Sequence, residues 1–316
     1  MNNTITASRQ NCILRCPRQH FFSYELGLRR DSISGFALRF GSAWHRAAEY
    51  RWLGATYDEA LICAIPEGVD MDLLGCNTLA AILAGYYDHY GPIETVGQLC
   101  PEEEFEQPIG HGWTAMGKID GLGRMMDGRS CIIESKTTGD SLLPTSDYWL
   151  RLRFNIQLYQ YYCAATDAGW DISTVIYDVV RKPSIKPKLV GKGKDKHKES
   201  VEEYCDRLWK DTVARPEFYF CRKDVPILQS DVDQFISQRE AIIGLIEHYR
   251  KSEKEDRQEA WPRNVSCDTC DFCEYKSFCL SNITINPDNL PSGFSIGVIN
   301  PELSHDTAEN IIEAAS

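Results

Sequence analysis

Two segments in the first hundred residues repeat hydrophobic side chains at steps of three and four, the spacing that places them on one face of a helix. The first spans residues 34–54 and ends at Gly54. Its apolar face consists of Phe36, Phe40, Trp44, Ala47 and Ala48. The second spans residues 77–90 and stops at Gly91 and Pro92, which do not continue a helix. We therefore expect two helices in this part of the chain.

After residue 100 the pattern changes to extended segments. Strands are expected at residues 103–109, 114–126 and 130–137, because glycine-containing turns separate these segments. Three successive strands joined by short turns predict an antiparallel meander.

Helical spacing returns at residues 146–168, and a segment rich in β-branched residues follows at 173–180. Two further helices are expected near 199–214 and 230–252. Strands followed by a helix and another strand predict an α/β fold with a central mixed sheet flanked by helices.

The chain has 316 residues, of which 43% are hydrophobic, and a formal net charge of −12. This composition excludes a disordered chain or a fibre, and no run of about 18 apolar residues occurs that would span a membrane. The charge is uneven. Residues 1–51 have a net charge of +5, residues 52–119 of −10 and residues 181–198 of +7. Prolines and glycines disfavour regular structure in the last of these, so it is either a solvated loop or a basic strap for a phosphate backbone.

Thirteen cysteines, an odd number in a chain without an apolar segment in its first 30 residues, do not indicate a secreted disulfide protein. We expect a cytoplasmic, reducing location, where clustered thiols more often hold metal. Eight cysteines are scattered and are interpreted as small buried side chains. Four others follow the spacing C-x2-C-x2-C-x5-C, namely Cys267, Cys270, Cys273 and Cys279.

Charged residues interrupt two of the expected strands. Asp120 lies near the centre of the second, and Glu134 and Lys136 share one face of the third. Such charges cost free energy when they lose water without gaining partners. Two carboxylates on adjacent strands can hold one Mg²⁺ or Mn²⁺ ion, and a nearby lysine can orient or deprotonate an attacking water. The alternative is an ordinary exposed ion pair between Glu134 and Lys136.

Four motifs, in this order, resemble the PD-(D/E)XK nuclease superfamily, and within it the RecB-like branch that includes AddB and the CRISPR adaptation nucleases. They are Gly41-x3-His45, Gly117-Lys118-Ile119-Asp120, Glu134-Ser135-Lys136 and Gln157-x3-Tyr161. The resemblance extends from about Ser8 to Cys279 and implies a restriction-endonuclease-like core. Ile119 replaces the nominal proline of the superfamily, which leaves the metal ligands in place.

The resemblance also implies roles for individual residues. His45, Asp120 and Glu134 would bind the metal, assisted by the carbonyl oxygen of Ser135. Lys136 would position the water. The simpler interpretation of His45 is a hydrogen-bonded histidine of the core.

Gln157 and Tyr161, one turn apart on a helix, would by the same resemblance support the site or the DNA strand. They could instead only hydrogen-bond across a helix surface. Glu103 or Glu104 could supply a further carboxylate, and the sequence does not choose between them.

In the same branch, an early cysteine joins three cysteines near the C-terminus to hold an iron–sulfur cluster. Here Cys16 precedes Pro17, and Cys270, Cys273 and Cys279 have the C-terminal spacing. The resemblance implies a [4Fe–4S] cluster that joins the N- and C-terminal segments. The alternative is Zn²⁺ held by the local set of four thiols that Cys267 completes, without Cys16.

These observations predict a nuclease domain at residues 1–282 and an acidic tail at 283–316. Within the domain, we assign 33–145 to a helical insert and the catalytic strands, 146–182 to a helix and strand of the core, 183–198 to the basic loop and 263–282 to the cysteine cluster.

The expected function is hydrolysis of phosphodiester bonds by a Mg²⁺- or Mn²⁺-dependent deoxyribonuclease, a single-strand exonuclease of DNA repair, recombination or phage and defence DNA processing. The alternative is a cluster-stabilised DNA-binding or assembly subunit that does not cleave. The chain has no G-x4-G-K-[ST] phosphate loop, so a helicase or recombination partner would have to unwind duplex DNA. Polarity, DNA or RNA preference, exo- or endonuclease action and oligomeric state stay open.

Overall fold

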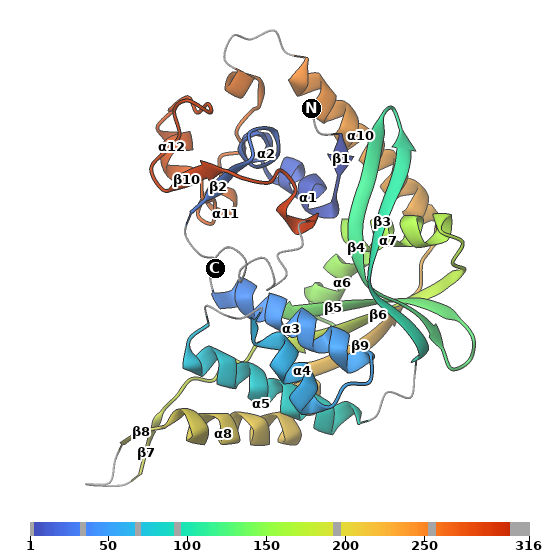
Figure 1. Ribbon diagram of the computed structural model, residues 1–316, viewed down its shortest axis with the longest axis vertical. Coiled ribbons are helices and arrows are strands. Elements are labelled where there is room, and N and C mark those ends of the chain that lie inside the picture. Colours follow the sequence, from blue (N-terminus) through green and yellow to red (C-terminus); the bar gives the residue numbers. More distant parts are fainter. Residues whose placement is uncertain are drawn as a thin grey trace, which may run out of the picture.

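The computed structural model describes residues 3–31, 36–66, 71–91, 96–191, 197–251 and 257–303. Within these residues, a six-stranded sheet has the order β1-β4-β5-β6-β9, and β3 pairs with β4 (Figure 1). Its strands are β1 (Thr4–Ile5), β3 (Val96–Gly110), β4 (Trp113–Met125), β5 (Ser130–Thr138), β6 (Ile172–Arg181) and β9 (Phe220–Val225). The expected meander is confirmed as β3, β4 and β5, which are antiparallel, while β5 and β6 are parallel. The predicted α/β class with a central mixed sheet is also confirmed.

Helices cover both faces of this sheet. One face packs against α6 (Asp147–Arg153), α7 (Ile156–Asp167) and the start of α10 (Gln229–Arg250). The other face meets α3 (Phe36–Trp52), which packs in turn with α4 (Tyr57–Ala64), α5 (Leu73–Tyr90) and α8 (Val201–Ala214). Figure 1 shows α3, α4, α5 and α8 as one helical layer beside the sheet.

Local capping explains where several helices begin. Residues 146–168, expected as one helix, form α6 and α7 instead, because the Asn155 side chain accepts a hydrogen bond from the Gln157 backbone N–H and starts a new helix. The helix expected from residue 77 already begins at Leu73, where the Asp72 side chain accepts from the Gly75 N–H. The sequence interpretation did not anticipate α4 or β9.

The basic segment is less irregular than expected. Two short strands within it, β7 (Leu189–Val190) and β8 (His197–Lys198), pair as an antiparallel ribbon. Part of the basic segment therefore has regular structure despite its prolines and glycines. Residues 192–196 lie outside the described part of the chain.

The two ends of the chain pack together. The remaining elements are α1 (Ala7–Arg15), α2 (Pro17–His20), the π-helix η1 (Phe21–Glu25), β2 (Leu28–Arg30), α9 (Pro216–Tyr219), η4 (Arg257–Ala260), α11 (Cys267–Cys270), α12 (Lys276–Leu280), β10 (Phe294–Ile296) and η5 (Pro301–Leu303). Strand β10 pairs antiparallel with β2. Of the acidic tail expected at 283–316, the part up to Leu303 therefore packs against the N-terminal segment, and residues 304–316 lie outside the described residues.

Further contacts fasten the segment before the cysteines to the N-terminal helices. The Arg18 guanidinium donates to the carbonyl oxygen of Trp261 at 2.8 Å, and its backbone N–H donates to Pro262 at 3.0 Å. The Tyr275 hydroxyl donates to the carbonyl oxygen of Leu28 at 2.9 Å. The ends of the chain are thus joined by hydrogen bonds of the protein itself.

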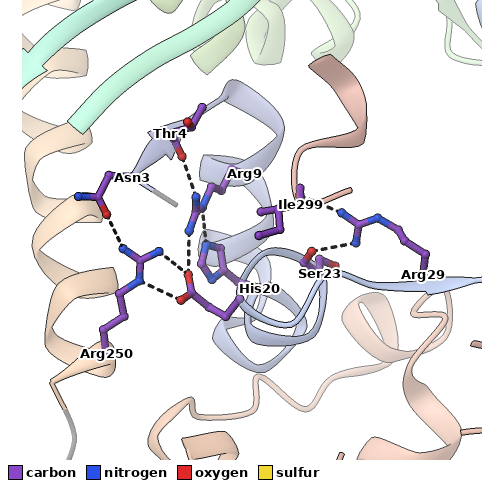
Figure 2. Close-up of polar contacts among 9 residues, drawn as sticks. Asn3, Thr4, Arg9, His20, Ser23, Arg29, Arg250 and Ile299 are labelled. Atoms are coloured by element: carbon purple, nitrogen blue, oxygen red, sulfur yellow. Dashed lines mark hydrogen bonds and ion pairs between the residues drawn. The ribbon is translucent and has the colours of Figure 1, made fainter. Parts of the chain in front are cut away.

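A buried ion-pair cluster ties these ends to the sheet. Glu25 accepts from Arg9 at 2.7 Å and from Arg250 at 2.8 and 2.9 Å. Figure 2 shows both arginines reaching inward, Arg9 to Thr4 and His20, and Arg250 to Asn3. The cluster therefore connects β1, α1, η1 and α10.

Three of the eight arginines of the basic segment 1–51 are buried in the fold. Arg9 is 0% exposed, Arg51 3% and Arg18 4%. The other five arginines of the segment, Arg15, Arg29, Arg30, Arg39 and Arg46, are partly or fully exposed, so only part of its positive charge lies inside the fold.

Glu25→Gln should destabilise the fold, because it leaves the buried Arg9 and Arg250 without a counter-charge. We expect the free energy of unfolding to fall by about 3–5 kcal/mol. Urea denaturation followed by circular dichroism measures this loss. Asp127→Asn, which breaks the half-exposed Asp127–Arg129 pair, is the matched control and should change stability little. A Glu25→Gln protein as stable as this control would contradict a structural role for the cluster.

Candidate functional site

A cleft of about 630 Å³ lies between α3, the β3–β4 strands, α7 and the start of α1. Five of the predicted site residues line it, from four different elements: His45, Asp120, Lys136, Gln157 and Tyr161. Glu134 and Ser135 lie directly beneath, in the strand that carries Lys136. The structure thus brings together every residue assigned to the nuclease motifs.

Strand pairing explains how the carboxylates meet. The β4–β5 ladder runs from Arg124 opposite Ser130 to Gly121 opposite Ile133. Asp120 directly precedes Gly121, at the end of the paired part of β4, and its Oδ2 accepts the backbone N–H of Ser135 at 2.9 Å. The cleft opens where the ladder ends.

His45 reaches the same carboxylate from α3. Its Nδ1 lies 3.4 Å from Asp120 Oδ2, and its side chain remains 32% exposed to the cleft. Gly41, one turn earlier, lies where this helix meets β5, and a Cβ there would make only ordinary van der Waals contact with the Thr137 hydroxyl, at 3.6 Å. His45 is therefore a cleft residue and not an enclosed core histidine.

Glu134 is a buried carboxylate next to the cleft. It is 1% exposed and forms an ion pair with Lys136. Its Oε1 contacts the Lys136 ammonium group in this ion pair, and its Oε2 has no hydrogen-bond partner among the described residues. A buried carboxylate oxygen without a hydrogen-bond partner, beside Asp120 and His45, fits a set of oxygen and nitrogen ligands for a divalent cation.

Lys136 is held from two sides. Besides Glu134, its Nζ donates to Gln157 Oε1 at 2.9 Å, and Gln157 Nε2 donates to the Tyr161 hydroxyl at 2.7 Å. Gly117 makes room for this chain of contacts, because a Cβ there would lie 2.8 Å from the Phe105 ring and 3.4 Å from Tyr161. Gln157 and Tyr161 therefore orient Lys136 and are not merely partners on a helix surface.

Charge coupling sets the protonation of these groups. Burial lowers the pKa of His45, but the Asp120 carboxylate outweighs burial and raises that pKa above its ordinary value. Conversely, burial raises the pKa of Asp120, and His45 outweighs it and lowers the pKa. Asp120 is thus ionised at neutral pH.

Glu134 behaves differently. Burial raises its pKa to about 7, against the opposing charge of Lys136 and with the support of the Asp120 charge. Burial also lowers the pKa of Lys136, but the two carboxylates outweigh burial and raise that pKa. Lys136 is therefore a cation at neutral pH, whereas Glu134 titrates there.

A further carboxylate in the cleft belongs to Glu102, not to Glu103 or Glu104 as suggested from the sequence. Glu102 lies across from Asp120 in the β3–β4 pair and lines the cleft. Glu103 is exposed, and Glu104 lines a neighbouring hollow. Glu102 has a φ of 54°, a backbone conformation unusual for a non-glycine residue. The sequence does not reveal this conformation, because Glu102, Glu103 and Glu104 are three identical residues in a row.

Gln160 was also missed. It is 0% exposed, donates to the carbonyl oxygen of Met116 at 2.9 Å and accepts from Gln10 at 2.6 Å. It thereby joins α1 and α7 to β4 at the back of the cleft. A lone glutamine within a helix gives no sequence signal of this kind.

The cysteines separate into two groups. Cys16, Cys270, Cys273 and Cys279 line one small hollow, whereas Cys267 is exposed and does not line it. Burial, together with the neighbouring thiols, raises the pKa of Cys273. The structure therefore brings Cys16 to the three C-terminal cysteines across most of the chain.

No ready metal centre is formed by these side chains alone. In the part of the chain that the structure describes, no group of three or more His, Cys, Asp or Glu residues is arranged to hold a metal ion. Within the same residues, no helix is both long enough and apolar enough to cross a membrane.

Comparisons with known proteins bear on this site. The family profile of the PD-(D/E)XK nuclease superfamily matches residues 4–280. A solved structure titled "Crystal structure of SSO0001" is similar at 13% sequence identity, over 90% of this chain and 89% of that chain, with a TM-score of 0.35. No curated protein matches the chain.

The raised pKa of Glu134 makes cation binding depend on pH. In the cation-free protein, the protonated carboxyl stabilises the fold at low pH, and this contribution is lost as pH rises from about 4.5 through about 7. A bound cation replaces the proton, so Mg²⁺ or Mn²⁺ should raise the melting temperature more at about pH 8 than at about pH 6. Thermal unfolding with and without the cation measures the difference. Glu134→Gln should abolish most of the shift, and an equal shift at both pH values in the unmodified protein would contradict the assignment.

Proposed function

The chain belongs to the PD-(D/E)XK nuclease superfamily, and we propose that it is a Mg²⁺- or Mn²⁺-dependent deoxyribonuclease that degrades single-stranded DNA from an end. The main support is that Asp120 and Lys136 line one cleft, and that the buried Glu134 pairs with Lys136 through Oε1 while its Oε2 has no hydrogen-bond partner among the described residues. Nucleases of this superfamily use divalent metals. The single-strand and exonuclease specificity, and a role with a helicase or recombination partner, rest on the resemblance to the RecB-like branch.

Asp120, Glu134 and His45 would hold the cation, with the Ser135 carbonyl oxygen as a further ligand. When bound, the cation lowers the pKa of a water molecule and stabilises negative charge on the phosphate. Asp120 is suited to this role because its pKa lies below the ordinary value, which keeps it ionised.

Lys136 would act as a cationic donor rather than as a base. Its pKa lies above the ordinary value, so it keeps its proton at neutral pH. From its position beside Glu134 and Gln157, it can orient the attacking water and stabilise the charge that develops on the phosphate. Gln157 and Tyr161 position its Nζ and limit its rotation.

For the cysteines, we propose a [4Fe–4S] cluster held by Cys16, Cys270, Cys273 and Cys279. The four thiols around one hollow support this set, and the exposure of Cys267 disfavours a local zinc site. A cluster there would add covalent links between chain ends that hydrogen bonds already join, which is a structural role.

The nuclease proposal is tested with end-labelled single- and double-stranded DNA in the presence of Mg²⁺, Mn²⁺ or a chelator. Glu134→Ala and Lys136→Ala should each reduce the cleavage rate by at least about a hundredfold, because they remove a metal ligand and a transition-state donor. Glu103→Ala, which removes an exposed carboxylate nearby, is the matched control and should cleave normally. Equal cleavage by all variants would reject the site, and no cleavage by the unmodified protein would favour a non-cleaving DNA-binding subunit.

The cluster proposal separates Cys16 from Cys267. Anaerobically purified protein should be brown and contain about four irons per chain. Cys267→Ala should keep both properties, and Cys16→Ala should lose the colour and the iron. Colourless protein with one zinc, lost in Cys267→Ala but kept in Cys16→Ala, would overturn the proposed ligand set.

A further inference from the structure

The C-terminal segment reaches the catalytic cleft from outside the nuclease motifs. Glu302 and Leu303, in η5, line the cleft together with His45, Asp120 and Lys136. They also line the adjoining hollow along β3 and β4. The segment therefore lies where the two hollows meet, next to the reactive side chains.

Glu302 occupies a position suited to an anion. Its Oε1 accepts hydrogen bonds from the Thr6 hydroxyl and, at 3.3 Å, from the Tyr24 hydroxyl. Thr6 is the N-cap of α1, and its Oγ1 also accepts the backbone N–H of Arg9 at 3.0 Å. The first residues of α1, Ala7 and Ser8, line the cleft beside it. The carboxylate thus lies at a helix N-terminus, which favours negative charge.

The preceding residues hold the segment in place. Gly297 N–H donates to the Gly27 carbonyl oxygen at 2.8 Å. A Cβ at Gly27 would lie 2.8 Å from the Gly297 carbonyl oxygen, so glycine permits this close crossing. Arg29 donates to the carbonyl oxygens of Val298 at 2.8 Å and Ile299 at 2.9 Å, and Figure 2 shows it bridging Ser23 and Ile299.

The last turn lies at the surface of the molecule. Pro301 and Glu302 are exposed, and Leu303 is half-buried. From Asn286 to Ser316 the chain contains five acids and no lysine or arginine. Glu302 therefore brings a negative charge to a cleft that is lined by four cations, Arg46, Lys118, Lys136 and Lys182, and by the carboxylates Glu49, Glu102 and Asp120.

We propose that Glu302 is an internal substitute for a nucleic-acid phosphate, and that a DNA strand must displace residues 301–303 to enter the cleft. The inference rests on the proposed nuclease function and adds a phosphate position at the start of α1 together with its regulation. Carboxylate and phosphodiester oxygens are both anionic acceptors, so the same donors serve either. The free protein is thus partly closed to its substrate by its own chain.

Binding measurements test this closure without cleavage. Fluorescence anisotropy of a labelled oligothymidylate in the presence of a chelator should give a Kd at least about threefold lower for Glu302→Ala than for the unmodified protein, because a larger fraction of molecules is open. Asp288→Ala removes one exposed carboxylate from the same segment outside the cleft and is the matched control. Equal tightening by both variants would reduce the effect to net charge and overturn the proposal.

Arg29→Ala provides a second variant with the opposite charge change. It removes a positive charge, which by itself would weaken DNA binding, whereas loosening residues 298–299 should strengthen it. Tighter binding supports the proposal, and unchanged or weaker binding contradicts it.

Hydrogen exchange on the unmodified protein follows the segment directly. Amides at residues 297–303 should exchange faster when the oligothymidylate is bound, and slower or unchanged exchange would show that the segment stays in place. The two proposals can fail separately. If the protein binds DNA as proposed but does not cleave it, only the nuclease proposal is rejected. If it cleaves DNA but Glu302→Ala does not change binding, only the displacement of residues 301–303 is rejected. If neither the unmodified protein nor Glu302→Ala binds or cleaves DNA, both the nuclease proposal and the closure proposal are overturned.

Discussion

The burial of the Glu134 carboxylate is the constraint on which the cleft depends. A carboxylate that is 1% exposed and has one oxygen without a hydrogen-bond partner is costly to ionise, and its raised pKa expresses that cost. Lys136 reduces the cost without removing it. The neighbouring elements therefore place charge and donors around this one strand: Asp120 from β4, His45 from α3 and Gln157 from α7. The cation proposed for this site would offset the cost by supplying the missing partner of the carboxylate.

The same elements depend on the closure of the chain ends. Glu25 pairs with two buried arginines from α1 and α10, and this cluster keeps α1 against the sheet edge formed by β1. The start of α1 then faces the cleft, and the C-terminal segment, paired to β2, reaches the same place. The packing of the two chain ends therefore helps to form the cleft, because it places α1 and the C-terminal segment there.

The elements that were predicted correctly are those set by local pattern. The meander β3–β5 follows from alternation and glycine turns, and α3, α8 and α10 follow from helical spacing and end signals. The break between α6 and α7 was missed because Asn155 can cap a helix or lie within one, and its hydrogen bond to Gln157 decides between them. The fold of residues 283–303 was missed because three residues pairing with β2 leave no periodic signal.

By itself, the sequence determined the α/β class and the nuclease motifs, because strand alternation and residue spacing are local properties of the chain. It also predicted that Asp120, Glu134 and Lys136 would lie together, since adjacent strands carry them. Only the tertiary structure decided that Glu102 faces Asp120, that Cys16 and not Cys267 joins the other three cysteines in one hollow, and that Glu302 enters the cleft. Each of these depends on a backbone angle or on contacts between distant segments, which the order of residues does not reveal.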